Sequence, residues 1–300
     1  MQKYLNYIKQ NYSDFRYISD KNILENLDYF ENINYKIISN EIWFCIIFTD
    51  FRISKDTCFF WFLEIYKNSK VKEFFNEIKN ISKNFNTKIL VWPINLSVWN
   101  TYRFWNFENN AEIALGEYDS NPSINDLLLE NNFKVYEKYI TAKRSWENPY
   151  ILNEEFNDYN IEKININKNT LKIIYDLSLL IFTSAPKIKF AEFWKYMQVY
   201  LELYKNNISE FILIYKWQNI WFLSSFYTKE YFVIKTVWIL KEFRWKWLWN
   251  LLLSYVYDYY LDLGYNSSYY LYMREKWDAL YMTNQGAEKY REYFTYYLEL

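Results

Sequence analysis

The sequence predicts an α+β protein made of two similar halves, each a mixed, mostly antiparallel sheet flanked by helices. Three observations lead to this prediction. Short apolar runs typical of strands alternate with amphipathic segments typical of helices. The same order of elements recurs in the second half of the chain. Hydrophobic residues make up 51% and charged residues 24% of the 300 residues, which is the balance of a globular protein.

The first half is expected to begin its sheet with a hairpin over 36–49, whose turn lies at Ser39–Glu41, and a third strand over 58–66. A helix is expected over 69–85, because apolar residues recur there at the i, i+3, i+4, i+7 spacing of one helix face. The remaining elements are a buried strand, a short helix and a strand, at 87–95, 123–132 and 133–143.

The second half repeats this order more clearly. A strand at 161–167 precedes a helix at 169–184, for which Asn169 is the expected N-cap. A second helix is expected at 189–205. Three strands then form a meander, at 210–217, 219–228 and 230–240. The last elements are a long helix stopped by Gly264, a strand, a short helix and a hairpin-like segment, at 251–264, 267–273, 278–284 and 289–300.

The stretch 145–160 carries Pro149 and shows no clear periodicity, so we interpret it as a linker. The sequence therefore predicts two domains, residues 1–148 and 155–300. It predicts no oligomeric state.

Composition argues against several classes of partner. The net charge is −1, with 35 basic and 36 acidic side chains, so no overall field favours nucleic acid. No run of 18 apolar residues is present, and the first residues lack the apolar core of a signal peptide, so we expect no membrane association. Cys45 and Cys58 lie in apolar runs and are expected to be buried thiols. These features together predict a cytoplasmic protein.

The absence of histidine limits the chemistry. With His 0 and Cys 2, Ser-His-Asp and Cys-His nucleophile systems and the usual zinc sites are excluded, and we expect no metal. Catalysis would have to use carboxylates, Tyr, Lys, hydroxyl groups, backbone dipoles or a bound cofactor.

Tryptophan is unexpectedly frequent. The chain has Trp 14 but Gly 3 and Pro 4, and its richness in Ile, Lys and Asn indicates an AT-rich gene in which the UGG codon should be rare. Several tryptophans also stand where a small residue is expected. Our hypothesis is that many of these codons are UGA and are read as glycine in the source organism. The alternative is that the tryptophans are genuine and fill cores or form an aromatic surface.

One segment suggests a phosphate-binding site. Arg244 and Lys246 alternate with Trp245, Trp247 and Trp249 between an apolar strand and the long helix. A helix N-terminus offers free N–H groups and partial positive charge, small residues allow a pyrophosphate to approach, and basic side chains add opposite charge. With glycine at the three tryptophan positions, the loop reads RGKGLGN.

That loop resembles the acetyl-CoA pyrophosphate loop of the GNAT superfamily of N-acetyltransferases, Arg/Gln-x-x-Gly-x-Gly/Ala. Arg244 matches its first position, and Trp247 and Trp249 match its two small-residue positions. The segment 234–240 resembles the strand that precedes this loop and holds the pantetheine arm. The resemblance covers 155–300 well, and 35–143 looks like a degenerate copy.

The resemblance implies an acetyl-CoA-dependent N-acetyltransferase that transfers an acyl group directly to a primary amine. Tyr281 is the implied general acid, although Gly286 follows it at five residues where four is the commonest spacing, and Glu230 is a possible base. The residues expected to contact the cofactor are Val237, Trp238, Ile239, Arg244, Trp245, Lys246, Trp247, Leu248, Trp249 and Asn250. Two alternatives remain: a catalytically inactive GNAT-like binding or scaffold protein, and a module whose exposed aromatic residues stack on sugars.

Overall fold

The computed structural model of the chain describes most of its residues. The described residues are 1–12, 14–25, 33–50, 54–66, 70–92, 104–105, 114, 116–117, 119–121, 123–145, 158–182, 208–243, 248–275, 282 and 286–300.

Helices and strands alternate along the described chain. The helices are α1 (Gln2–Asn11), α2 (Asp14–Glu25), α3 (Val71–Asn84), α4 (Ser123–Glu130), α5 (Lys168–Phe182), α7 (Leu248–Asp262) and the short 3-10 helix Lys241–Phe243. The strands are β1 (Ile33–Ser39), β2 (Trp43–Asp50), β3 (Thr57–Ile65), β4 (Ile89–Trp92), β5 (Phe104–Trp105), β6 (Lys134–Ser145), β7 (Tyr159–Ile164), β8 (Ile208–Tyr215), β9 (Gln218–Tyr227), β10 (Phe232–Ile239), β11 (Ser267–Arg274) and β12 (Glu288–Glu299).

All the strands belong to one 12-stranded sheet in the order β1-β2-β3-β4-β12-β6-β11-β10-β9-β8-β7, with β5 paired to β12. Neighbouring strands are antiparallel except β3 with β4 and β10 with β11, which are parallel. Each half therefore contains an antiparallel meander followed, after a helix, by one parallel strand. The expected fold class, two similar copies of a mixed, mostly antiparallel α+β unit, is confirmed.

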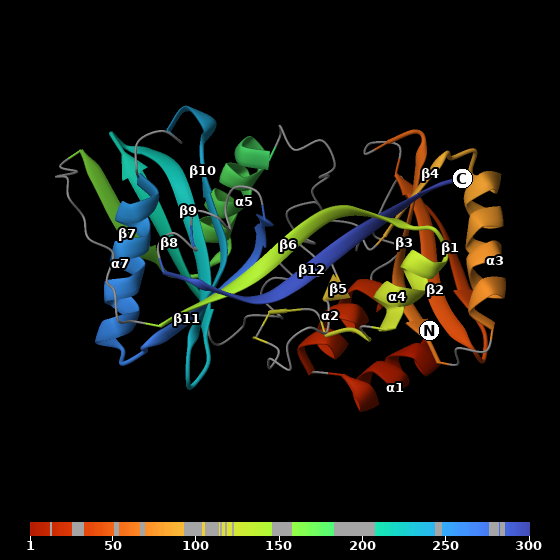
Figure 1. The fold of residues 1–300 in the computed structure, drawn as a ribbon. Helices are drawn as coiled ribbons and strands as arrows, with labels where there is room; N and C mark the ends of the chain where they lie inside the picture. Colours follow the sequence, from red (N-terminus) through yellow and green to blue (C-terminus); the bar gives the residue numbers. More distant parts are fainter. Residues whose placement is uncertain are drawn as a thin grey trace.

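Two long strands join the halves at the centre of the molecule (Figure 1). β6 leaves the first half and pairs with β11 of the second half, from Tyr139↔Arg274 to Ser145↔Ser267. β12 runs the other way and pairs with β4, from Trp92↔Tyr296 to Ile89↔Glu299. β6 and β12 also pair with each other along most of their length, from Lys134↔Tyr297 to Lys143↔Glu288. Each half thus receives a strand from the other, and the division into domains 1–148 and 155–300 stays a prediction.

In the first half, the sheet lies between two layers of helices. Side chains from β2, β3 and β4 alternate between two buried clusters: Cys45, Phe60 and Trp92 pack with α3, whereas Phe44 and Trp61 pack with α1 and α2. A strand covered on both faces needs apolar residues at every position. This explains the long apolar runs of β2 and β3, in which every residue is buried, the polar Thr49, Asp50 and Glu64 included.

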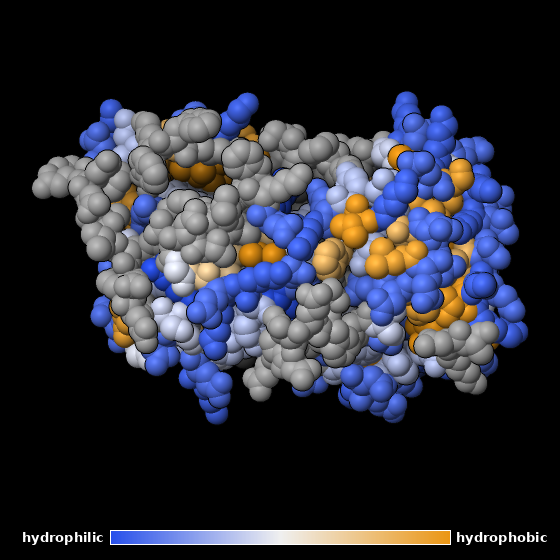
Figure 2. Space-filling view, viewed as in Figure 1, coloured by the Kyte–Doolittle hydropathy of each residue, from blue (hydrophilic) through white to orange (hydrophobic). Residues whose placement is uncertain are grey.

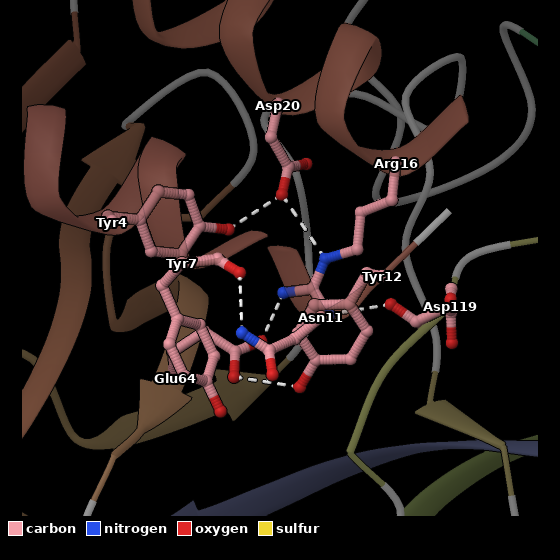
Figure 3. A network of polar contacts seen from close by, with 8 residues as sticks. All are labelled: Tyr4, Tyr7, Asn11, Tyr12, Arg16, Asp20, Glu64 and Asp119. Atoms are coloured by element: carbon pink, nitrogen blue, oxygen red, sulfur yellow. Dashed lines mark hydrogen bonds and ion pairs between the residues drawn. The ribbon is translucent and has the colours of Figure 1, made fainter. Parts of the chain in front are cut away.

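A buried ion network attaches α2 to this sheet (Figure 3). The Arg16 guanidinium donates to Glu64 of β3, to Asp20 at 3.3 Å and to the carbonyl of Asp119 at 2.6 Å. Tyr12 donates to the second oxygen of Glu64 at 3.0 Å. Arg16, Asp20 and Glu64 are 0% exposed, so we interpret the network as a structural connection between α2, β3 and the loop before α4.

In the second half, α7 packs through its aromatic residues. The Tyr260 ring stacks on Phe232 of β10 at 4.1 Å, and its hydroxyl lies 2.8 Å from that of Ser225 in β9. α5 lies behind β9 and β10 in the view of Figure 1 and joins the same hydrophobic core through Leu171, Ile174 and Leu177.

Several expected boundaries are corrected by the structure. α5 begins at Lys168, and its N-cap is Asn167 rather than Asn169, because the Asn167 side chain accepts the N–H groups of Asn169 and Thr170 at 2.9 and 3.1 Å. α7 begins at Leu248 instead of 251. The segment 289–300 is not a hairpin but part of one continuous strand, because it finds partners in β4 and β6 along its length.

Other expectations are confirmed or lie outside the described residues. The strands and helices predicted at 58–66, 69–85 and 123–132 are present within a few residues, and Gly264 ends α7 with φ +90°. The helix expected at 189–205, most of the one at 278–284 and most of the linker 145–160 lie outside the described part of the chain.

Figure 2 shows one face of the molecule, on which hydrophobic patches lie among hydrophilic residues over the half that carries α3 and α4. Within the described ranges, no helix has the length and apolar character needed to cross a bilayer.

Candidate functional site

The parallel strands β10 and β11 separate part of the way along their length. They pair only at Phe232↔Ser268, Val233↔Tyr269 and Ile234↔Tyr270. Beyond this point β10 continues beside β9, and β11 continues beside β6. The facing backbone edges of β10 and β11 are therefore no longer joined to each other, and an extended ligand could pair with them as an additional strand does.

A bulge on each strand marks the point of separation. The register of β10 with β9 shifts between Ile234 and Thr236, which makes Lys235 the extra residue. The register of β11 with β6 shifts between Tyr270 and Met273, and Tyr272 has φ +54°. Bulges bend a strand and increase its twist, so paired bulges account for the divergence.

The diverging strands enclose a cavity of about 300 Å³. Its lining residues are Trp221, Ile234, Lys235, Thr236, Val237, Ile239, Trp249, Tyr270, Leu271, Tyr272 and Met273. The wall combines apolar and aromatic side chains with polar groups, among them Lys235 and Thr236, a mixture found at small-molecule sites.

The N-terminus of α7 lies at the edge of this cavity. Trp249, in the first turn of α7, lines the cavity and packs against Trp221 of β9 with ring centroids 5.4 Å apart. The free N–H groups and the dipole of a 15-residue helix favour an anion at this end.

Lys235 is the one residue with an amine or carboxylate side chain among the described residues that line the cavity. Burial lowers the pKa of its amine to about 8, and the nearby Glu210 carboxylate opposes this shift. Glu210 is 0% exposed and accepts a hydrogen bond from the Ser224 hydroxyl at 2.7 Å. Lys235 is partly exposed, and because it lines the cavity, we assign its exposed surface to that space.

The structure brings together part of the predicted cofactor site. Val237, Ile239 and Trp249 line the cavity, and Leu248 and Asn250 lie beside Trp249 in the first turn of α7. Trp238 belongs to β10, but its side chain is outside the described part. Arg244, Trp245, Lys246, Trp247 and Tyr281 also lie outside the described residues.

Glu230 does not line the cavity. It is exposed in the turn between β9 and β10, where its N–H donates to the Thr228 hydroxyl at 3.1 Å. Ile234, the first residue of β10 at the cavity, comes four residues later, about 13 Å along an extended strand. The structure therefore does not place Glu230 beside Val237 and Ile239.

Sequence reasoning missed Lys235 and the contribution of β11. A lysine inside the apolar run of β10 was a signal for Lys235. The lining residues of β11 gave no such signal, because only the paired bulges turn them toward the cavity.

Glu117 lies in the loop before α4 and is 1% exposed. Its Oε2 accepts from the Ala114 N–H at 2.8 Å and from Arg291 of β12 at 3.1 Å. Burial raises the pKa of this carboxyl, while Arg291 lowers it. The loop is thus tied to the strand that enters from the second half.

The described part of the chain offers little for a metal ion. It contains no group of three or more His, Cys, Asp and Glu side chains placed to hold one. Burial raises the pKa of both thiols, to about 12 for Cys58, so Cys45 and Cys58 are inert, buried side chains.

Comparison with known proteins gives a fold but no sequence relative. No protein-family model matches the chain, and no curated protein matches it. A tandem GNAT protein from the clavulanic acid biosynthesis pathway is similar in structure, with a TM-score of 0.60 at 9% identity over 94% of this chain and 87% of that one.

Two further solved structures are similar to this chain. A probable N-acyltransferase from Enterococcus faecalis V583, described as a conserved protein of unknown function, gives a TM-score of 0.61 at 8% identity over 99% of this chain and 68% of that one. A GCN5-related N-acetyltransferase from Sphaerobacter thermophilus gives 0.50 at 8% identity over 89% of this chain and 76% of that one. The chain has the fold of the GNAT superfamily, present in two copies that exchange a strand.

Proposed function

We propose that the chain is an N-acetyltransferase that moves an acetyl group from acetyl-CoA directly to a primary amine. The observation that supports this best is the cavity between the diverging strands β10 and β11, with the N-terminus of α7 at its edge. In this proposal the pantetheine arm lies along the open backbone edge of β10. The thioester carbonyl accepts a backbone N–H near Val237 or Trp238.

The pyrophosphate is proposed to bind at the start of α7, with Arg244 and Lys246 supplying positive charge. Direct transfer needs no enzyme nucleophile, which suits a chain without histidine. Tyr281 is proposed to protonate the departing thiolate. Glu230 could act as base only through a chain of water molecules, because it does not line the cavity.

The tryptophans decide whether this site can bind its substrate. Three indoles at 245, 247 and 249 would take the space that a pyrophosphate needs, and Trp249 already forms part of the cavity wall. We propose that these three positions are glycine in the native protein, and call the protein with glycine at 245, 247 and 249 the glycine form. Mass spectrometry of the peptide 243–253 from the source organism identifies these residues directly.

Isothermal titration with acetyl-CoA tests the proposal. The glycine form should bind, whereas the protein with tryptophan at the three positions should not. A matched variant with alanine at the same positions removes the indoles but keeps the Cβ atoms, and should bind more weakly because alanine resists φ > 0. Arg244→Ala in the glycine form should weaken binding about tenfold or more, since a charged hydrogen bond to phosphate is lost. A glycine form that gives no binding heat contradicts the proposal.

CoA release then identifies the acceptor class. We would test ethanolamine, spermidine, lysine and an alanyl peptide as primary amines, with a thiol reagent reporting free CoA. Release that depends on an amine supports acetyl transfer. The second candidate function, an inactive GNAT-like scaffold, is favoured by the Trp221–Trp249 contact in the cavity wall, and it predicts no release with any amine.

A module that stacks sugars on exposed tryptophans receives little support. Trp43, Trp61, Trp92 and Trp221 are at most 4% exposed, and among the described tryptophans Trp217 alone is strongly exposed, at 99%. One exposed indole on a turn does not form an aromatic binding face within the described part of the chain.

A further inference from the structure

Lys235 occupies the point at which β10 and β11 part. The last pair between the strands is Ile234↔Tyr270, and Lys235 is the next residue of β10 and the extra residue of its bulge. In a regular strand, side chains alternate between the two faces of the sheet. The extra residue of a bulge breaks this alternation and so changes the direction of a side chain. Lys235 therefore stands at the apex of the cavity, two residues before Val237.

The residues of β10 that precede Lys235 are apolar and buried. Phe232, Val233 and Ile234 are at most 3% exposed. A lysine in such a run is unusual, because burying an ammonium without strong compensation is costly. Lys235 lines the cavity beside Thr236 and Val237, where the proposed thioester would lie.

The electrostatic environment favours a change of protonation near neutral pH. Desolvation lowers the pKa of Lys235 to about 8, and the Glu210 carboxylate of β8 opposes this shift. Tyr270 and Tyr272 of β11 face the same cavity as neighbours of Lys235. At pH 7–8 a substantial fraction of Lys235 is neutral and can accept a proton.

We propose that Lys235 is the proton acceptor that activates the amine for acetyl transfer. This inference rests on the proposed function. A neutral amine attacks the thioester, the N–C bond forms and the C–S bond breaks. The proton on nitrogen passes to Nζ of Lys235, and CoA leaves as a thiolate that is protonated by Tyr281 or water. The role does not require Glu230, which lies outside the cavity.

The first test compares Lys235→Met with Lys163→Met in the glycine form. Lys163 is an exposed lysine of β7 and serves as the matched control. With the best amine of the panel, Lys235→Met should lower kcat/KM about 100-fold, the usual contribution of a general base, and Lys163→Met should change it less than twofold. Both variants should bind acetyl-CoA in isothermal titration as the parent does.

The pH profile separates a catalytic role from a structural one. In the parent, kcat/KM divided by the neutral fraction of the amine should rise with pH and level off above about 8, because neutral Lys235 is the active form. In Lys235→Met this rise should disappear. A variant that keeps its activity within threefold, or that loses activity but keeps the same rise, overturns the inference.

Chemical rescue provides a second measurement. Treating Lys235→Cys with 2-bromoethylamine converts the thiol to an S-aminoethyl side chain, which restores an amine at nearly the same length. Cys45 and Cys58 are buried with raised pKa values and should not react. Recovery of at least a tenth of the parent kcat/KM supports the role, and no recovery in protein with complete modification opposes it. If the parent itself binds no acetyl-CoA, the proposed function fails first.

Discussion

At the scale of single residues, Trp217 gives the clearest structural evidence on the tryptophan question. β8 ends at Tyr215 and β9 begins at Gln218, so Lys216 and Trp217 form a two-residue turn. Both have positive φ, +45° and +71°, as a type I′ turn requires. Glycine is strongly preferred at the second position, and the Trp217 ring is 99% exposed, so it gains no packing there. The position suits glycine.

Trp217→Gly should therefore stabilise the protein by about 1 kcal/mol, because it relieves a left-handed conformation that costs roughly 1–2 kcal/mol for a residue with a Cβ. Trp217→Ala is the matched control: it removes the same exposed ring but keeps the Cβ, and should leave the midpoint of urea unfolding nearly unchanged. Equal midpoints for the two variants would show that the turn carries no such strain.

The buried tryptophans are a different case. Trp43, Trp61 and Trp221 pack in cores, yet their indole N–H groups have no acceptor within the described part of the chain. Each such group costs about 1–3 kcal/mol, which opposes the gain from burying a large ring. Packing alone does not distinguish tryptophan from a recoded glycine at these positions.

At the scale of elements, β12 determines how the halves combine. It begins beside β6 and ends beside β4, where Tyr296 and Leu298 are buried in the core of the first half. The Tyr296 hydroxyl also donates to Asn125 of α4 at 2.7 Å. The first half therefore obtains part of its core from the far end of the chain.

Removing residues 296–300 should loosen the first half more than the second. The truncation removes the β4 partner and leaves apolar residues of α3 and α4 exposed to water. Hydrogen exchange should show faster exchange in β4 and α4, while β8 and β9, which do not contact this segment, keep their protection. Equal loss of protection in both halves would mean that the molecule unfolds as one unit.

At the scale of the whole molecule, a buried ion pair links the loop before α4 to β12. Glu117 and Arg291 are 1% and 3% exposed, and their atoms lie 3.1 Å apart. Gly116 beside them has φ +91°, and a Cβ there would collide with Phe226 and lie 3.1 Å from Leu271. The first half is thus fitted closely against the strands that form the cavity of the second.

Arg291→Met should lower the free energy of unfolding by about 3–5 kcal/mol at pH 7.5, because a buried carboxylate loses its partner. The raised pKa of Glu117 sets the sign of the pH dependence. Above that pKa, the variant buries an uncompensated carboxylate and its free energy of unfolding is lowered. As the pH falls through the pKa, the carboxyl becomes neutral and this loss of stability disappears. Urea unfolding at pH 5 and 7.5 measures this.

Lys289→Met is the control for that prediction. Lys289 is in the same strand and contacts Glu292, but its side chain is 46% exposed, so its loss should cost no more than about 1 kcal/mol. If Arg291→Met lowers the free energy of unfolding as much at pH 5 as at pH 7.5, the buried carboxylate of Glu117 is not the cause of the loss.

Much of the fold followed from local pattern. The amphipathic spacing of α3 and the apolar runs of β2, β3 and β9 identified these elements, because period and composition report directly on which faces are buried. The cavity residues Val237, Ile239 and Trp249 were also anticipated, through resemblance to a known loop and strand. Glu230 was chosen from its position in sequence near β10, and the structure puts it on the far side of the bulge.

The sequence by itself determined the order and type of the elements, their recurrence in two halves and the loop before α7, since each depends on residues close together in the chain. Only the tertiary structure decided three other features: the exchange of β6 and β12, the paired bulges that open the cavity, and the burial of Glu117 against Arg291. These depend on contacts between residues far apart in the chain, and no local periodicity carries that information.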